Sequence, residues 1–380
     1  MAHLAGRRCK TIQSALGPNK LERAYYHCTH CKAGFAPRDR SLGIEHSSVS
    51  PAVLRMIGTV GAMLSFEEGS ALLAELAGVE IDAKQVERLA EKLGAEIASD
   101  EKQNGEALDQ APLPPVLYLG LDGTGVPMRA TELAGRSGKQ ADGSAKTREV
   151  KLCTVWSAQS RNPDQPPQRD EGSITYSAAI ESAAAADTDA CSAEFTQRVL
   201  REASRRRFTQ AERTVVLGDG APWIWNIAKE LFPRATQIVD RFHVKQHLSE
   251  LSKSIYGATS TEAAAWAERR HEELDAGRFP DLLRAVRRHA DKYDEARKCF
   301  QYLHRNRHRM RYPQFEADGL CTSTGVVEAG CKLAIGTRLK RAGMHWTVAG
   351  ANAIIALRCS RLSGRFQDYW ERRNEQHKAA

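Results

Sequence analysis

Two short apolar runs in this chain each end in an aspartate followed by glycine. The first is VLYLGLDG at residues 116–123, and the second is RTVVLGDG at residues 213–220. Each has the length and composition of a buried strand. A third run, TQIVD at residues 236–240, also ends in an acid. Such runs, interleaved with helical segments, predict a mixed α/β core with carboxylates at the strand ends.

The rest of the chain supplies the other elements of this core. Further strands are predicted at residues 150–156 and 173–179, and helices at about 190–205 and from Pro222 onward. Residues 244–312 show helical periodicity and no convincing strand. The sequence therefore predicts a block of about 70 helical residues set inside the α/β core.

Residues 48–104 are predicted to form a helical region. Ser50 precedes Pro51 at the start of one helix, and Ser65 begins a capping-box pattern. Gly78 ends that helix and Asp82 caps the next. The pair resembles a helix-turn-helix, but its second helix is not basic enough for a persuasive DNA reader. A plain helical linker domain is the favoured interpretation.

The charge of the chain is concentrated at its two ends. Of 380 residues, 55 are Lys or Arg and 47 are Asp or Glu, a net charge of +8. Residues 301–380 hold 14 basic and 6 acidic side chains, and residues 1–50 hold 8 and 3. Basic ends around a mildly acidic middle favour a polyanion partner, above all nucleic acid. The alternative is a basic surface that serves only solubility.

Other classes of protein are disfavoured by the sequence. No apolar run approaches the roughly 20 residues of a membrane-spanning helix. The start, MAHLAGRRCK, lacks the apolar segment of a secretory signal. We therefore expect a cytoplasmic protein with no membrane partner, whose nine cysteines are thiols or metal ligands.

The acids at the strand ends suggest a metal site. Asp122 and Asp219 would be partly desolvated and would repel each other unless a cation lay between them. Mg²⁺ prefers oxygen ligands, and two such ions bridged by carboxylates serve in-line attack at phosphate. The alternative is that each Asp-Gly pair only makes a turn.

A third carboxylate is predicted on a helix near these strand ends. Glu328 lies in the small, apolar segment GVVEAG at residues 325–330, where a charge has no structural reason to be. A basic run follows it, comprising Lys332, Arg338, Lys340 and Arg341. On a helix these side chains would approach phosphates while Glu328 holds a metal ion. The alternative is a surface glutamate on an amphipathic helix.

These motifs together resemble those of a DDE-class insertion-sequence transposase, of the Kra-type branch related to Mutator-like elements. The resemblance rests on GLDGTGVP at 120–127, GDGAPWIW at 218–225 and GVVEAGCK at 325–332. Further matches are DGSAKTREVK at 142–151, DRFH at 240–243 and RLKRAGMHW at 338–346. It extends from about residue 23 to about residue 360.

The resemblance implies an α/β fold with an RNase H-like, mixed-sheet catalytic core. Asp122 would lie on its first strand, Asp219 after its fourth and Glu328 on a late helix, with an all-helical insertion between the last two. These three acids would bind two Mg²⁺ or Mn²⁺ ions. The implied reaction is DNA strand cleavage by water at the element ends, followed by joining of the freed 3′ hydroxyl to target DNA.

The resemblance also implies secondary site residues and partners. Asp240 and His243 form a D-x-x-H motif that would order the active-site side of the insertion. They are equally an ordinary i, i+3 pair on a helix. The partners would be double-stranded DNA, as terminal repeats and as target, and further copies of the chain in a homo-oligomer associated with the nucleoid.

DNA contacts are predicted from the basic run and from tryptophans. Lys332, Arg338, Lys340, Arg341 and Trp346 are the predicted DNA-binding residues. Trp223, Trp225 and Trp266 are further candidates for stacking on unpaired bases near the cut. Core packing is the favoured interpretation for Trp223.

The N-terminal cysteines predict part of a zinc site. Cys28 and Cys31 form a CxxC pair, which is half of a four-ligand zinc ribbon. The family pattern has a second CxxC upstream, whereas this chain has only Cys9 there. Either Zn²⁺ is bound with substitute ligands such as histidine, or the chain begins inside the ribbon.

The predicted organisation has five regions. They are a partial zinc ribbon at 1–47, a helix-turn-helix-like region at 48–108, the first part of the core at 116–243, a helical insertion at 244–316, and the last core helix with a basic tail at 317–380. Two other functions are conceivable. One is a catalytically silent, truncated, DNA-binding regulator derived from a transposase, and the other is an RNase H-fold nuclease that only cuts.

Overall fold

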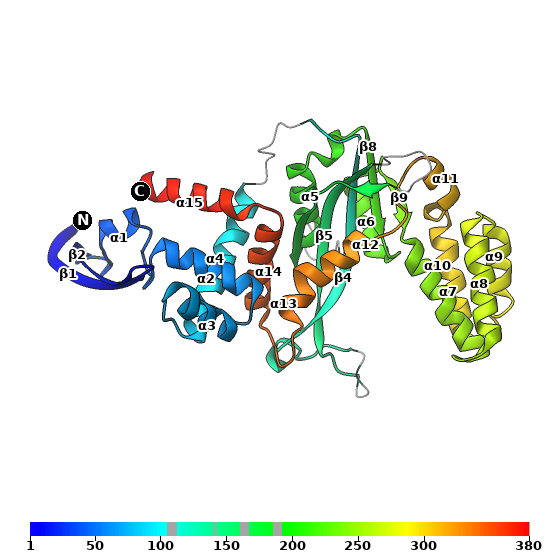
Figure 1. Ribbon diagram of the computed structural model, residues 1–380, viewed down its shortest axis with the longest axis horizontal. Helices are drawn as coiled ribbons and strands as arrows, with labels where there is room; N and C mark the ends of the chain where they lie inside the picture. Colours follow the sequence, from blue (N-terminus) through cyan, green and yellow to red (C-terminus); the bar gives the residue numbers. More distant parts are fainter. Residues whose placement is uncertain (105–111, 139, 141–142, 160–166, 185–191, 380) are drawn as a thin grey trace. The chain divides into compact units, whose positions relative to one another are not determined.

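The computed structural model describes residues 1–104, 112–138, 140, 143–159, 167–184 and 192–379 (Figure 1). The chain divides into two compact units. Unit 1 comprises residues 1–104, 126–148 and 334–380, and unit 2 comprises residues 105–125 and 149–333. No helix in the described ranges is long and apolar enough to span a membrane. Residues 105–111, which span the end of the predicted helical region and the proline-containing linker that the sequence indicates at 109–115, and Asp142 of the quoted motif lie outside these ranges.

Unit 2 is built on a six-stranded mixed sheet. Its strands are β4 (Val116–Pro127), β5 (Thr147–Gln159), β6 (Gln168–Arg169), β7 (Thr175–Ala179), β8 (Arg213–Gly218) and β9 (Thr236–Val239). The order is β6-β5-β4-β8-β9, and β7 also pairs with β5. Strands β4, β8 and β9 run parallel, whereas β7 runs antiparallel to β5. The prediction of a mixed α/β core is confirmed.

The helices of unit 2 include those predicted from the sequence. They are α5 (Glu194–Arg205), α6 (Pro222–Leu231), α7 (Arg241–Tyr256), α8 (Thr261–Asp275), α9 (Phe279–Arg287), α10 (Asp294–Asn306), α11 (Tyr312–Ala317) and α12 (Gly325–Gly330). Helices α7–α11 form the predicted helical block, which we call the insertion. It begins and ends at neighbouring points, because the Arg241 amide donates to the Thr322 carbonyl at 3.0 Å.

Helix α12 packs closely against the sheet. A Cβ atom at Gly120 of β4 would lie 2.2 Å from Val327 Cγ2 of α12, so only glycine fits there. At Gly330, the other end of α12, a Cβ atom would lie 3.0 Å from Tyr176 of β7 and 3.1 Å from Leu152 of β5, which is a tight but less severe approach. These glycines allow the helix that carries Glu328 to lie directly on the strands.

Unit 1 combines an N-terminal hairpin with helices from both ends of the chain. It contains β1 (Ala2–Ser14), β2 (Gly17–Cys28), β3 (Gly34–Phe35), α1 (Pro37–Ser41), α2 (Pro51–Met63), α3 (Phe66–Ala77), α4 (Ala83–Gln103), α13 (Thr337–Leu339), α14 (Val348–Leu362) and α15 (Phe366–Ala379). Ser50, Ser65 and Asp82 cap helices α2, α3 and α4 as predicted. Gly78 ends α3 with a φ of 60°, also as predicted.

The C-terminal segment forms part of this helical unit. A Cβ atom at Gly94 of α4 would lie 2.0 Å from the Ala353 carbonyl oxygen of α14. A Cβ atom at Gly58 of α2 would lie 3.7 Å from Leu357 of α14, which is an ordinary packing distance. The expectation of a basic tail after the core is therefore wrong for residues 348–362, because α14 is largely buried between the N-terminal helices.

The hairpin of β1 and β2 is longer than predicted. From the sequence, only residues 23–28 are predicted to form a short strand, whereas the two strands pair from Ala2 with Cys28 to Ser14 with Gly17. Most side chains of β1 are exposed on both faces. A strand that buries neither face has no alternation of apolar and polar residues by which it could be recognised.

Candidate active site at the sheet edge

Three aspartates lie at one edge of the sheet, just beyond the last paired residues of the three parallel strands. Gly120 pairs with Leu217, and Gly218 pairs with Val239. If the first register is continued by two positions, Asp122 is level with Asp219. If the second is continued by one position, Asp219 is level with Asp240. Neighbouring strands lie about 4.8 Å apart. The sheet therefore brings together the acids that the sequence places at its strand ends.

Asp122 lies in β4, where it is half-buried. Its Oδ1 accepts a hydrogen bond from the Gly123 amide at 2.7 Å. Burial raises the pKa of the Asp122 carboxyl group, and the charge of Asp219 raises it further, while His243 and a hydrogen bond with Cys331 act in the opposite direction. Two carboxylates in such surroundings favour a bound cation.

Asp219 directly follows β8, and its loop is held by the insertion. Its Oδ1 accepts from the Ala221 amide at 2.8 Å. Its main-chain carbonyl accepts from the hydroxyl group of Tyr302 in α10 at 2.7 Å. Gly220 has a φ of +100°, and a Cβ atom there would lie 2.5 Å from the Tyr302 ring. The loop thus requires glycine both for its backbone and for contact with α10.

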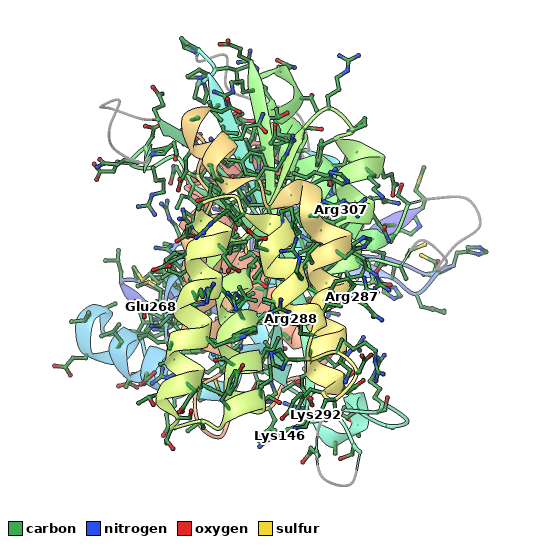
Figure 2. All side chains as sticks on the ribbon, turned by 90° about the vertical axis from the view of Figure 1, so that its right-hand side faces the viewer. Lys146, Glu268, Arg287, Arg288, Lys292 and Arg307 are labelled. Carbon is green, nitrogen blue, oxygen red and sulfur yellow. The ribbon has the colours of Figure 1, made fainter. Side chains whose placement is uncertain are left out.

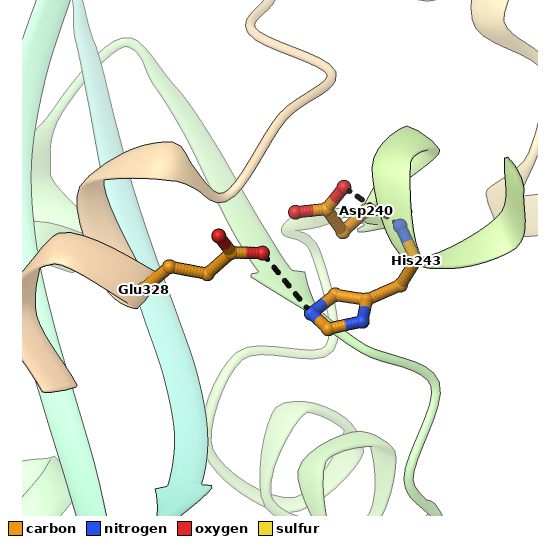
Figure 3. Close-up of side chains that lie close together, drawn as sticks. All are labelled: Asp240, His243 and Glu328. Atoms are coloured by element: carbon orange, nitrogen blue, oxygen red, sulfur yellow. Dashed lines mark hydrogen bonds and ion pairs between the residues drawn. The ribbon is translucent and has the colours of Figure 1, made fainter. Parts of the chain in front are cut away.

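Glu328 projects from the first turns of α12 and is exposed. Its Oε1 lies 3.4 Å from Nε2 of His243 (Figure 3). His243 extends from the start of α7, so Glu328 contacts the first helix of the insertion. Residues 325–330 form a helix, as predicted.

Asp240 is fully buried and serves as the N-cap of α7. Its Oδ1 accepts from the amides of Phe242 and His243, and its Oδ2 accepts from the amide and hydroxyl groups of Thr324. Burial raises the pKa of Asp240. Four donors occupy the roughly four acceptor positions of a carboxylate. Asp240 therefore ties α7 to the residue before α12 and has little capacity left for a metal ion.

The donor set at this edge suits a hard divalent cation. Asp122, Asp219 and Glu328 offer carboxylate oxygens, which Mg²⁺ and Mn²⁺ prefer. Within the described ranges, Asp219 has one carboxylate oxygen without a hydrogen-bond donor. The one group of three possible ligands found within 4.8 Å of one another there is Asp240, His243 and Glu328. Glu328 is therefore turned toward His243, and its side chain would have to rotate to join Asp122 and Asp219.

Two predicted DNA-binding residues prove to be packing residues. Arg338 is fully buried, donates to the Gly61 carbonyl at 3.0 Å, and lies over the rings of Phe66 and Trp346 at 4.6 and 5.1 Å. Trp346 is 6% exposed, and its indole NH donates to the Leu339 carbonyl. The expectation that these two side chains reach DNA is wrong, because both are enclosed within unit 1.

The rest of the basic run is at the surface. Lys332 and Lys340 are exposed. Arg341 is also exposed and forms a two-pronged ion pair with Glu68, one contact of which measures 2.6 Å. Lys332, Lys340 and Arg341 therefore stay predicted DNA contacts. The run is also not one continuous α-helix, since a π-helical segment (Cys331–Gly336) precedes α13.

The tryptophans near the sheet pack against other side chains. Trp223 meets Phe195 edge to face at 5.7 Å, in agreement with the favoured packing role. Trp225 is 4% exposed and lies under the guanidinium group of Arg309. Trp266 lies in the insertion and is partly exposed.

The cysteines of the predicted zinc site flank a turn at the end of β2. The Cys28 amide donates to the Ala33 carbonyl at 2.8 Å, and hydrogen bonds from Cys31 lower the pKa of the Cys28 thiol. Cys9 pairs with Glu22, seven positions along β1 from the residue opposite Cys28. In the described part of the chain no third ligand completes a cluster with Cys28 and Cys31. Cys9 is thus excluded as their partner within one chain.

Three residues of the site were not predicted from the sequence. Tyr302 holds the loop of Asp219, Thr324 binds Asp240, and Cys331 forms a hydrogen bond with Asp122. The sequence points to Thr324 and Cys331 only in that they flank the Glu328 segment. No sequence pattern points to Tyr302, since it lies 83 residues from Asp219, whose carbonyl it contacts.

One family model matches a segment of this chain. Residues 189–314 match the family model "DDE_Tnp_ISL3: Transposase". The matched segment includes Asp219, Asp240, His243 and most of the insertion. No curated protein matches the sequence.

One similar solved structure is described as "Drosophila P element transposase strand transfer complex". It has 9% sequence identity and a TM-score of 0.28, with 88% of this chain and 83% of that chain covered. A TM-score of this size does not show a shared fold. The assignment therefore rests on the family match, in which residues 189–314, about a third of the chain, are similar to DDE transposases of the ISL3 type.

Proposed function

We propose that this transposase binds the terminal repeats of a bacterial insertion sequence and cuts and joins DNA strands there, with Asp122, Asp219 and Glu328 as its catalytic carboxylates. The observation that carries this proposal is the parallel pairing of β4 with β8, which runs to Gly120 and Leu217 and, continued by two positions, sets Asp122 level with Asp219. This pairing explains how two acids that are 97 residues apart in the sequence come to lie close together in space.

The topology supports an RNase H-like core. If the two-residue β6 is left aside, β4 is the first strand of the sheet and β8 is the fourth. Asp122 then lies on the first strand, Asp219 follows the fourth, and Glu328 lies on a helix after the insertion. This is the arrangement that the resemblance to DDE transposases implies. The finer Kra-type assignment stays a prediction from the quoted motifs.

Each part of the site has a distinct task in this proposal. Asp122 and Asp219 would hold the divalent ions from the sheet, with Glu328 as the third ligand from α12. When bound, the ions would activate the attacking oxygen and stabilise the leaving oxygen. Tyr302 keeps the Asp219 loop in place, and Asp240 fixes the starts of α7 and α12 relative to each other. His243 retains Glu328 at the edge of the site until the ligands assemble.

The test is a cleavage assay on a duplex that carries the element's own terminal repeats, with Mg²⁺ or Mn²⁺. Asp122→Asn, Asp219→Asn and Glu328→Gln should each lower cleavage by roughly a thousandfold or more, while DNA binding persists. Asp318→Asn, at an exposed acid after α11, is the matched control. Full cleavage by all three variants would contradict the proposal. Cleavage without any joined product would instead favour a nuclease that only cuts.

The proposal extends to assembly and zinc. Two DNA ends must be held together for transposition, so we expect at least two copies of the chain on paired ends. Light scattering on the DNA complex measures this. Cys28 and Cys31 would supply two ligands for Zn²⁺, and the other two would have to come from outside the described hairpin. Metal analysis of the purified protein, with a Cys28→Ser, Cys31→Ser variant as control, tests this point.

A further inference from the structure

The insertion contains a cavity that lies outside the site described above. Its volume is about 520 Å³, within the range typical of small-ligand sites. Residues of α7, α8 and α9 and of the turn after α9 line it. Figure 2 shows this helical bundle facing the viewer, with Arg287, Arg288 and Lys292 extending from it. We call this cavity the insertion pocket.

The insertion pocket has an excess of positive charge. Five arginines line it, against the two carboxylates of Glu273 and Asp281. Arg270 takes up Glu273 in a buried, two-pronged ion pair at 2.6 and 2.7 Å, and Arg284 pairs with Asp281 at 2.9 Å. Among the residues that the structure describes, Arg278 and Arg288 have no carboxylate partner. Two guanidinium groups are therefore available to an anion.

The positive electrostatic potential of the pocket acts on the His289 side chain. Burial lowers the pKa of this imidazole, and the charges of Arg270, Arg288 and Lys292 lower it further. No acidic group acts on it in the opposite direction. A phosphate group that entered here would therefore gain from several cations at once.

One wall of the pocket is aromatic. Tyr256, Trp266 and His289 approach one another at ring distances of 6.0 to 6.4 Å. Arg270 lies 5.1 Å from the centre of the Trp266 ring and is itself fixed by Glu273. Because Trp266 is only partly covered, a flat ring can still stack on it.

We propose that the insertion pocket binds one unpaired nucleotide of a DNA strand, with its phosphate at Arg278 and Arg288 and its base against Trp266 and Tyr256. An anion alone would not need the aromatic wall, and an acidic peptide would bring no ring to stack on it. The inference rests on the proposed function, since it presumes that the chain binds DNA. It adds a second point of contact, separate from the catalytic carboxylates.

The experiment compares DNA substrates with the full-length protein in the absence of divalent metal. Fluorescence anisotropy measures the affinity for a blunt duplex, for the same duplex with a short single-stranded overhang, and for an overhang without bases. The wild-type protein should prefer the overhang with bases. Trp266→Leu should weaken binding of that substrate by roughly tenfold and leave the blunt duplex unchanged. Trp266→Phe should retain part of the preference.

The charge component is tested through the salt dependence of binding. Arg278→Gln, Arg288→Gln should reduce the slope of log affinity against log salt for the overhang by about 0.7, the value for one phosphate contact on a single strand. Arg234→Gln, Arg305→Gln is the matched control, since both arginines are exposed in unit 2 but do not line the pocket. This control should leave the base preference intact.

The outcomes separate the two proposals. Wild-type protein that neither binds nor cuts DNA would overturn the proposed function itself. Wild-type protein that binds and cuts, with pocket variants no different from the control pair, would overturn the insertion pocket alone. Equal weakening of blunt and overhang substrates by Trp266→Leu would also overturn it, because base stacking would then not be the cause. Circular dichroism confirms that each variant is folded.

Discussion

The charged residues at the sheet edge differ in accessibility from those in the basic run at 332–341. The sequence suggests a functional role for both sets. At the edge, Asp122 and Asp219 each have one oxygen fixed by a main-chain amide, and both stay partly accessible. In the basic run, Arg338 is fully buried and Arg341 is tied to Glu68. A count of charges thus says little about which of them can meet a ligand.

The difference has a physical origin. At the end of a strand the main-chain pairing of the sheet stops. An acidic side chain there is oriented by the strand but is not enclosed by neighbouring residues. A long arginine can instead cover apolar surface and donate to carbonyl groups inside the fold. Arg338 does so between Phe66 and Trp346.

Replacement of Arg338 should damage folding and not DNA binding as such. Arg338→Ala removes the partner of the Gly61 carbonyl and opens space beside two aromatic rings, so we expect the free energy of unfolding to fall by about 3 kcal/mol. Lys332→Ala, at an exposed position, should change it by less than about 0.5 kcal/mol. Urea unfolding measures both. A stable Arg338→Ala protein with lost DNA affinity would reverse our interpretation of this residue.

Asp240 should prove to be a structural acid at the sheet edge. In Asp240→Asn the amide NH₂ group would face donors, so we expect a loss of about 2 kcal/mol in unfolding free energy and slower cleavage. The concentration of Mg²⁺ needed for half-maximal cleavage should stay unchanged. Asp122→Asn should raise that concentration. If Asp240→Asn raises it as well, Asp240 is a metal ligand and the hydrogen-bond argument fails.

Tyr302 and Tyr312 offer a matched pair of hydroxyl groups. The Tyr302 hydroxyl donates to the Asp219 carbonyl, and the Tyr312 hydroxyl donates to the Val239 carbonyl at 3.0 Å. Each Tyr→Phe change should cost about 1 kcal/mol of unfolding free energy. Only Tyr302→Phe should also slow cleavage by folded protein, because it loosens the loop of Asp219, one of the proposed catalytic acids. Equal cleavage by both variants would remove Tyr302 from the positioning role.

The exposed part of the basic run should contribute to the salt dependence of DNA binding. Lys332→Gln should reduce the slope of log affinity against log salt by about 0.9, the value for one phosphate contact on duplex DNA. Arg341→Gln should reduce it less, because Glu68 already neutralises the Arg341 charge. An unchanged slope in both variants would remove the run from the DNA interface.

The smallest effect concerns the pH dependence of the Arg341–Glu68 pair. Hydrogen bonds from Arg341 and then from Ser65 lower the pKa of Glu68 to about 2 from its ordinary 4.5. A lowered carboxyl pKa stabilises the fold above the ordinary value, and this contribution is lost as the pH falls toward 2. Arg341→Gln should therefore lower the melting temperature slightly at pH 7, and the difference from wild type should shrink below pH 4.5. A constant difference across this range would contradict the assignment.

Local sequence patterns predicted the strands that carry the acids and the helices around them. Capping residues such as Ser65 and Asp82 marked helix starts correctly because a cap bonds to amides three residues away. The exposed hairpin at 2–28 was underestimated because neither of its faces is apolar. The burial of Arg338 and the contact of Tyr302 with Asp219 depend on residues brought together by the fold. No pattern within one segment records such a contact.

The main-chain hydrogen bond between Arg241 and Thr322, together with the contacts of Asp240 with Thr324, has a consequence for engineering. A segment of 80 residues leaves and rejoins the core at points that are already bonded to each other. Apart from Tyr302 and Tyr312, whose hydroxyl groups donate to main-chain carbonyls at the strand ends, the length and content of such a segment place little demand on the sheet beneath it. The insertion is thus a natural place for grafting. A foreign DNA-binding module attached between residues 256 and 294 would leave the contacts of Arg241 with Thr322 and of Asp240 with Thr324 intact. The geometry of the carboxylates would then stay undisturbed.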